Sequence, residues 1–152
     1  MLKVWVAVGL VLVMTGCSGF WQSRAGVKDG KLRSCPITPN CVNSEENWPL
    51  SGIEPISYEG SPEEARTRLL AILKDRKRVN VVKVEDRYIY AEFTSAIIGF
   101  VDDVEFLIVE APKVIHVRSA SRLGITDFFV NRIRVEGIRE RFAEAGKEKA
   151  RP

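Results

Sequence analysis

The sequence predicts a single α+β domain, in which an antiparallel sheet of four or five strands carries two helices packed on one face. Three observations support this prediction. A helix-start signature precedes a one-sided apolar stripe, four β-branched and aromatic runs follow at short intervals, and a second amphipathic segment comes last. The order helix, strands, helix is typical of α+β proteins. The length of 152 residues, 45% of them hydrophobic, suits one domain with a modest core.

The first helix is predicted to begin at the sequence Ser61-Pro62-Glu63-Glu64. Ser61 is a suitable N-cap, proline is favoured at the first helical position, and Glu64 completes a capping box. The helix should end near Asp75. Its apolar residues recur at helical spacing and therefore share one face: Ala65, Leu69, Ile72 and Leu73.

Four runs rich in β-branched and aromatic residues predict the strands, at residues 79–84, 88–94, 104–109 and 114–119. The connections at residues 85–86 and 111–113 are short enough for hairpins, so a meander is the expected topology. Apolar and amphipathic residues alternate in the second run, as in a sheet covered on one side. Residues 56–58 are expected to add an edge strand.

The second helix is predicted to start at Thr126 or Asp127 and to end by about Ala145. Its apolar stripe is expected to consist of Val130, Ile133, Ile138 and Phe142. The ordered domain then spans residues 34–146, and the charged tail at 147–152 should fray. Residues 35–55 contain four prolines and are expected to form an ordered surface loop, which Trp48 pins to the core.

The first residues have the pattern of an export signal. A positive start is followed by an apolar run at residues 4–13 that is short for a membrane span. Residues 14–17 then resemble a bacterial lipoprotein box, which implies a signal peptide at 1–16, lipidation of Cys17 and a tether at 17–33. An ordinary signal peptide is the alternative. The expected location is the bacterial cell envelope, lipid-anchored and facing the periplasm, and Ser18 slightly favours the outer membrane.

The two remaining cysteines, Cys35 and Cys41, are expected to form a disulfide, because an exported chain meets an oxidising compartment. The loop between them is short and contains two prolines, so the bond should shape a local surface. Two thiolates without a nearby histidine cannot complete a zinc site. The sequence therefore indicates no metal and no cofactor.

Charge and histidine content exclude several function classes. The net charge of +3 is too small to indicate a nucleic-acid partner. His116 is the single histidine, which excludes any mechanism that needs two imidazoles. Ser121 has no predicted base, and Asp102 and Asp103 should point to opposite faces of a strand. Catalysis is therefore disfavoured.

Polar residues gather in two places and form the candidate sites. The candidate ligand-binding residues are Arg118, Ser119, Ser121, Arg122, Asp127, Asn131 and Arg134, which we expect to converge in space. The candidate acidic cluster comprises Glu92, Asp102, Asp103 and Glu105. One interpretation is a pocket for a small anion or a lipid head group. The other is a structural network in which these arginines pair with the carboxylates; the strand register decides whether Glu105 faces Arg118 or Ser119.

Four motifs resemble one known family: Cys35-Pro36 with Pro39-Asn40-Cys41-Val42, Ala91-Glu92-Phe93-Thr94, residues 100–106, and Arg118-Ser119-Ala120-Ser121-Arg122 with Asp127, Asn131 and Arg134. The family is the uncharacterised domain of unknown function 1499, and the likeness spans about Cys35 to Phe142. Phe129 departs from it, because a small residue, often glycine, is usual there. The resemblance implies no established activity.

These observations together predict an envelope lipoprotein that binds a small anionic ligand, a lipid head group or a protein, and that performs no catalysis. The membrane is reached through the N-terminal lipid. Two alternatives stay open. One is a hydrolytic enzyme acting on envelope substrates, and the other is a structural interaction protein that uses the apolar loop at residues 95–101, although folding of that loop into the core is favoured.

Overall fold

The computed structural model describes residues 25–97, 99–123 and 129–149 of the chain. The described strands are β1 (Val27–Lys28), β2 (Lys31–Leu32), β3 (Cys41–Asn43), β4 (Ile56–Ser57), β5 (Val79–Val84), β6 (Tyr88–Thr94), β7 (Val101–Val109) and β8 (Val114–Ser121). The described helices are α1 (Pro62–Lys74) and α2 (Val130–Lys149). This confirms the α+β prediction.

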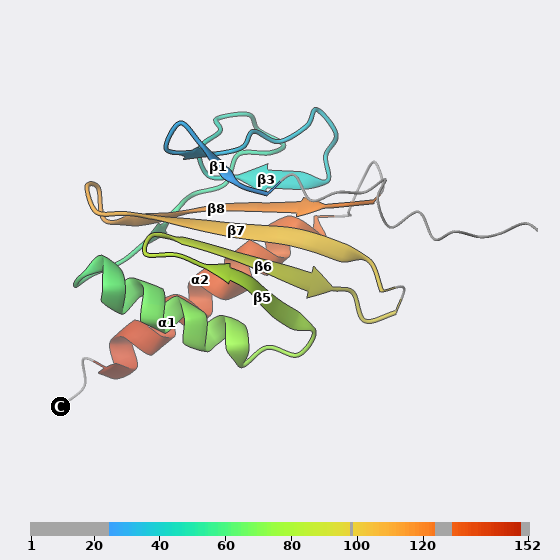
Figure 1. Ribbon diagram of the computed structural model, residues 1–152. Coiled ribbons are helices and arrows are strands. Elements are labelled where there is room, and N and C mark those ends of the chain that lie inside the picture. The colour runs from blue at the N-terminus through green and yellow to red at the C-terminus, as the bar shows by residue number, and fades with distance from the viewer. Residues whose placement is uncertain (1–24, 98, 124–128, 150–152) are drawn as a thin grey trace, which may run out of the picture.

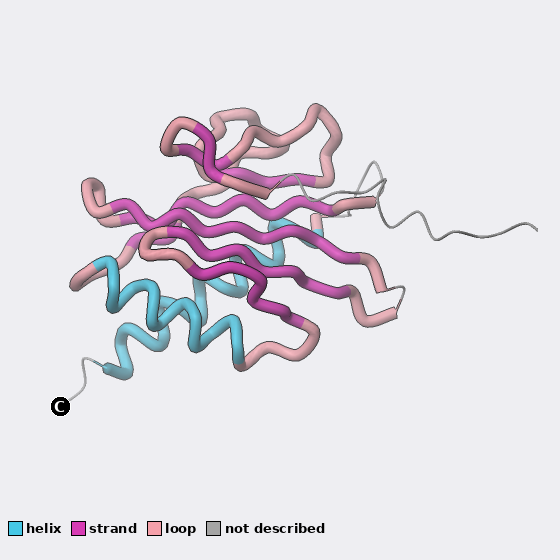
Figure 2. Tube along the Cα trace, in the orientation of Figure 1, coloured by secondary structure: helices cyan, strands magenta, loops and turns pink. Residues whose placement is uncertain are grey.

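The main sheet has six strands rather than four or five. Strands β5 to β8 form the expected antiparallel meander, and the sheet order is β3-β8-β7-β6-β5, with β4 also pairing with β8. Figures 1 and 2 show both helices on one side of this sheet. β3 was not expected, because its three residues lie within the proline-rich loop and adopt strand geometry through pairing with β8.

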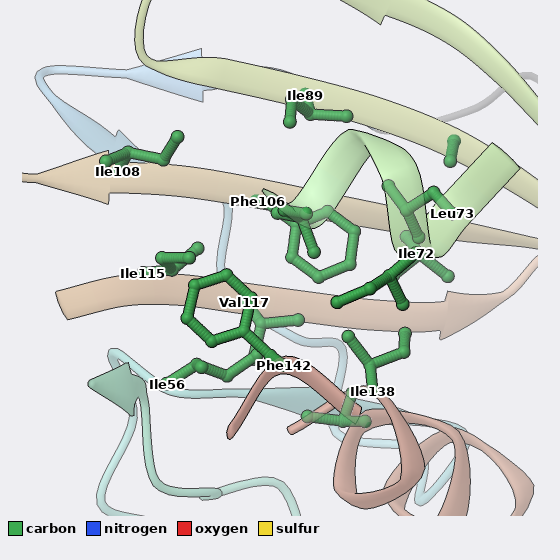
Figure 3. Packing of buried hydrophobic residues seen from close by; sticks show 14 of the residues in the cluster. Ile56, Ile72, Leu73, Ile89, Phe106, Ile108, Ile115, Val117, Ile138 and Phe142 are labelled. Atoms are coloured by element: carbon green, nitrogen blue, oxygen red, sulfur yellow. The ribbon is translucent and has the colours of Figure 1, made fainter. Parts of the chain in front are cut away.

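The core lies between the sheet and the two helices (Figure 3). Every second residue of β7 points into it, namely Val104, Phe106 and Ile108, as period-two alternation requires. Helix α1 begins as predicted, with Ser61 as N-cap and a complete capping box with Glu64. The predicted face of α1 is buried throughout: Ala65, Leu69, Ile72 and Leu73.

Helix α2 begins at Val130, later than expected, directly after Phe129. Phe129 has a positive φ of 65°, a left-handed conformation in which the helix cannot continue towards the N-terminus. Half of the predicted stripe is wrong, since Val130 and Ile133 are exposed. The face that meets the sheet carries Asn131, Val135, Ile138 and Phe142. The helix also extends to Lys149, into the segment expected to fray.

The sheet face opposite the helices carries a small two-stranded sheet, β1 and β2, within the segment expected to be a tether. Leu32 is buried there against Tyr88 and Tyr90, with Leu107 alongside. The described structure therefore starts before the predicted domain boundary at residue 34. This hairpin was missed because it contributes a single buried apolar side chain, so it has no hydrophobic period of its own.

Two apolar segments that we expected to fold inward are exposed. Trp48 is 65% exposed and does not pin its loop to the core. Ile97 is 95% exposed and Phe100 is 43% exposed, at the turn between β6 and β7. Both corrections place apolar surface where a second molecule could reach it.

Candidate functional site

The polar candidates divide between the two faces of the sheet. Residues of even number on β8 share one face and residues of odd number share the other, so Arg118 points away from the helices while Ser119 and Ser121 point towards them. The predicted convergence of all these residues is therefore wrong. Asp127, which was expected to join them, lies outside the described residues.

On the face away from the helices, Glu105 stands opposite Arg118 in the register of β7 and β8. Arg118 Nη1 donates to Glu105 Oε2 over 3.0 Å, and the two side chains are 4% and 0% exposed. Glu105 Oε1 also accepts from Tyr88 Oη at 2.7 Å and from the backbone N–H of Gly26 at 2.5 Å. Burial, assisted by the hydrogen bond to Glu105, raises the pKa of Tyr88 above its ordinary value.

A second group on the same face surrounds Asp103. Its Oδ1 accepts from Tyr90 Oη at 2.6 Å and from Arg122 Nη2 at 2.7 Å, and Arg122 Nη2 also donates to Glu92. The hydrogen bond to Asp103 raises the pKa of Arg122 above its ordinary value, while burial acts in the opposite direction. The guanidinium thus stays charged and engaged with two carboxylates.

The face towards the helices holds the third group, which joins β7 and β8 to α2. Asp102 pairs with Arg134, whose Nη1 donates to Ser119 Oγ over 3.0 Å. Ser119 Oγ donates to Asn131 Oδ1, and Asn131 Nδ2 donates to the carbonyl of Asn40 over 3.0 Å and to Ser121 Oγ over 3.1 Å. Asp102 and Asp103 lie on opposite faces, as alternation predicts.

The contacts within these three groups favour a structural role. Each of the three arginines is matched by at least one carboxylate, so within the described residues of these three groups no positive charge is left over for an anion. Most of their hydrogen bonds tie one segment of the chain to another. Such an arrangement favours the structural interpretation over an anion pocket, because the arginine charges already face carboxylates.

One contact resembles the start of a catalytic pair. Ser44 Oγ lies 3.2 Å from His116 Nδ1, and it also accepts from the backbone N–H of Val117 at 2.8 Å. Sequence reasoning missed this pair because 72 positions separate the two residues. A serine nucleophile needs a base that a third group orients, yet within the described part of the chain the His116 ring has no further hydrogen bond.

A cavity with mainly apolar walls lies beside the disulfide. Cys35 and Cys41 are bonded, as predicted, with their Cα atoms 5.6 Å apart. The loop that they close and the following loop enclose a cavity of about 370 Å³, which we call the disulfide groove. Its walls are mainly apolar and include Pro36, Ile37, Pro39, Trp48 and Leu50.

Hydrogen bonds hold the walls of this groove in place. Glu46 accepts from the backbone N–H of Cys35 and from Ser51 Oγ, both at 2.6 Å, and so links the two loops. Arg132 of α2 donates to the carbonyls of Leu50 and Gly52. Ile37, Trp48 and Leu50 nevertheless stay exposed. The groove therefore combines a restrained backbone with uncovered apolar side chains.

Trp48 also borders a second cavity of about 410 Å³, which lies between the same loop and α2. Ser44, Arg132 and Glu136 contribute to its lining. In the ranges 25–97, 99–123 and 129–149, no three histidine, cysteine or carboxylate side chains are grouped as metal ligands. No helix in those ranges has the length and apolar character to cross a membrane.

Comparison with known proteins gives a family but no activity. No curated protein and no solved structure matches the chain. The family model described as a protein of unknown function, DUF1499, matches residues 31–142. The matched segment contains all the side chains of the three polar groups, the disulfide and both walls of the groove. Because the match covers most of the chain, the chain belongs to the DUF1499 family.

Proposed function

We propose that the protein is a lipid-tethered, non-catalytic interaction module of the bacterial cell envelope, which holds an extended apolar segment of a partner protein in the disulfide groove. One observation carries the proposal. Ile37, Trp48 and Leu50 are 102%, 65% and 56% exposed around a single cavity, although their loops are held by a disulfide and by partly buried hydrogen bonds.

The composition of the groove suits protein recognition. Exposed apolar side chains that gather around a hollow favour a binding surface over an ordinary exterior. Tryptophan contributes strongly to protein interfaces, because its ring buries a large area at a small cost in conformational entropy. The restrained loops lower the entropy lost on binding.

The cavity size indicates the kind of segment that fits. A volume of about 370 Å³ holds a few side chains and no folded domain. Thr38 lines the cavity, and its Oγ1 donates to Asn40 Oδ1 but can still accept a hydrogen bond from a peptide N–H. An extended peptide with apolar side chains is therefore the occupant that we propose.

The tether and the location come from the sequence. The export pattern, with Cys17 at the end of the apolar run, supports lipidation and retention at the envelope. The disulfide is consistent with export, because such bonds persist in oxidising compartments. Mass spectrometry of the purified mature chain tests this part: an acylated N-terminal Cys17 supports the tether, and an unmodified one contradicts it.

Cross-linking in living cells tests the groove. A photoreactive benzoylphenylalanine replaces Ile37, and a matched control carries it at Asp86, a fully exposed residue in the β5–β6 turn. We expect one discrete protein adduct from position 37 and none from position 86. Equal adducts from both positions, or none from either, would contradict the proposal.

A hydrolytic enzyme acting on envelope substrates is the second candidate, because Ser44 contacts His116 beside the 410 Å³ cavity. A fluorophosphonate probe separates the two functions. The interaction module predicts that Ser44 stays unlabelled, whereas an enzyme predicts labelling that Ser44→Ala abolishes.

A further inference from the structure

The turn between β6 and β7 presents apolar side chains to the outside. Its ends are closed by two hydrogen bonds: Ser95 N–H donates to the carbonyl of Phe100 at 2.8 Å, and Phe100 N–H donates to Ser95 Oγ at 2.9 Å. Ile97 and Phe100 project from this closed turn, 95% and 43% exposed. They contribute nothing to the hydrophobic core described above.

Basic residues lie beside this turn. The backbone carbonyl of Arg78 accepts from Thr94 N–H at 2.9 Å, which brings the α1–β5 connection alongside the end of β6. Lys77 and Arg78 are exposed and make no ion pair with a described residue. Two carboxylates near this connection already have partners, because Asp75 pairs with Arg141, and Glu92, opposite Asn80 on the paired strand, pairs with Arg122. This end of the sheet therefore has free positive charge next to apolar side chains.

The opposite end of the sheet has a different character. Its β5–β6 turn carries Glu85 and Asp86, which pair with Lys83 and Arg66. Glu110, next to the β7–β8 turn, pairs with Arg87. The described turns at this end carry no apolar side chain as exposed as Ile97, and the cation there, Lys113, donates to the backbone carbonyl of Gly60 over 2.9 Å. Because the two ends of the sheet differ in this way, the end with the β6–β7 turn is the better suited to contact an anionic surface that has an apolar interior.

We infer that Ile97 and Phe100 enter the interfacial layer of an anionic bilayer, with Lys77 and Arg78 over the lipid head groups. The inference rests on the proposed lipid tether. Eight peptide units join Cys17 to Ala25 and span at most about 28 Å when extended, so the domain stays close to the bilayer. A lipid chain combined with a basic and apolar contact anchors a domain more firmly than either alone.

This orientation leaves the disulfide groove available. The groove belongs to the loops around β3, at one edge of the sheet order β3-β8-β7-β6-β5, whereas the membrane-contacting turn joins β6 to β7 towards the other edge. Figure 1 shows the loops before and after β3 on the side of the sheet away from β5 and β6. A bilayer contact and a partner peptide can therefore be accommodated together.

A depth measurement on the mature lipidated protein tests the inference. Ile97→Cys provides the one free thiol if Cys17 is acylated, because Cys35 and Cys41 are bonded. The thiol is labelled with an environment-sensitive fluorophore, and the protein is placed in phosphatidylethanolamine–phosphatidylglycerol vesicles that contain spin-labelled lipids. Asp86→Cys, at the far end of the sheet, is the matched control.

We expect lipid quenching at least threefold stronger at position 97 than at position 86. Replacing Lys77 and Arg78 with glutamate should weaken that quenching, as should vesicles made of phosphatidylcholine alone. Equal quenching at the two positions overturns the inference. A label that is shielded only when envelope proteins are added would assign the turn to a protein partner and would also overturn it. Mass spectrometry of the same protein tests the lipid tether independently. An unacylated Cys17 would contradict the proposed tether, whereas the quenching experiment tests only the membrane contact of the turn.

Discussion

Arg118 Nη1 donates to Glu105 Oε2 across the paired strands β7 and β8, with both side chains buried on the sheet face away from the helices. The same carboxylate accepts from Tyr88 and from the backbone of Gly26, so it fastens the chain before β1 to the sheet. A carboxylate with these partners satisfies its hydrogen-bonding capacity within the protein. The pair therefore has a structural role.

Replacing Arg118 with alanine should strongly destabilise the folded protein. Arg118→Ala leaves Glu105 buried without its cation, which typically lowers the free energy of unfolding by about 3 to 5 kcal/mol. Arg87→Ala is the control, because Arg87 and Glu110 form an exposed pair at 2.8 Å. We expect the control to lose under about 1 kcal/mol in urea unfolding. Similar losses in the two variants would contradict the structural role.

Alkaline pH should destabilise the protein through Tyr88. Its pKa in the folded state is raised above the unfolded value of about 10, so the folded state retains the phenolic proton longer. This contribution is complete below pH 10 and is lost as the pH rises above it, by up to about 1.4 kcal/mol per pH unit. Urea unfolding between pH 9 and 11 should show this decline, with a shallower slope in Tyr88→Phe. An unchanged slope would contradict the assignment.

The local features were readable from the sequence, and the long-range ones were not. The capping box of α1 depends on Ser61 and Glu64, three positions apart, and the bounds of β5 and β6 agree with the predicted runs. The pairing of Glu105 with Arg118 stayed open, because it depends on the register that the 110–113 turn imposes. β3 required pairing with β8, which no local pattern shows.

Part of the arrangement of the polar groups could have been predicted from the sequence. The alternation that separates Asp102 from Asp103 also separates Arg118 from Ser119, so the division of the cluster follows once β8 is predicted. The buried face of α2 was harder to predict. It includes Asn131, a polar residue that is buried because Ser119, Ser121 and Asn40 satisfy its hydrogen bonds.

Replacing Phe129 with glycine should stabilise the folded protein. Its φ of 65° is unfavourable for a residue with a side chain, whereas glycine adopts this conformation without a steric cost. Phe129→Gly is expected to raise the free energy of unfolding by about 1 kcal/mol. Ile133→Gly is the control: Ile133 is equally exposed at 67% but lies within α2, and there glycine should cost about 1 kcal/mol. The two variants should therefore differ in sign, and a loss in both would contradict this interpretation.

The disulfide should matter more for the groove than for global stability. Cys35 and Cys41 close a short loop, so the double variant Cys35→Ala/Cys41→Ala should lose only about 2 kcal/mol in unfolding free energy. The photoadduct from position 37 should fall severalfold, because the loop that carries Ile37 is released. An adduct of unchanged yield would show that the bond does not organise the binding surface.

The central claim is that the disulfide groove binds and that the arginine groups hold the fold. The most direct test is the photoadduct yield from position 37, together with the melting temperature, in Trp48→Ala and Arg122→Ala proteins. We predict that Trp48→Ala abolishes the adduct without lowering the melting temperature, because Trp48 is exposed, whereas Arg122→Ala lowers the melting temperature and keeps the adduct. The reverse result, an adduct lost in Arg122→Ala at an unchanged melting temperature and retained in Trp48→Ala, would contradict the account.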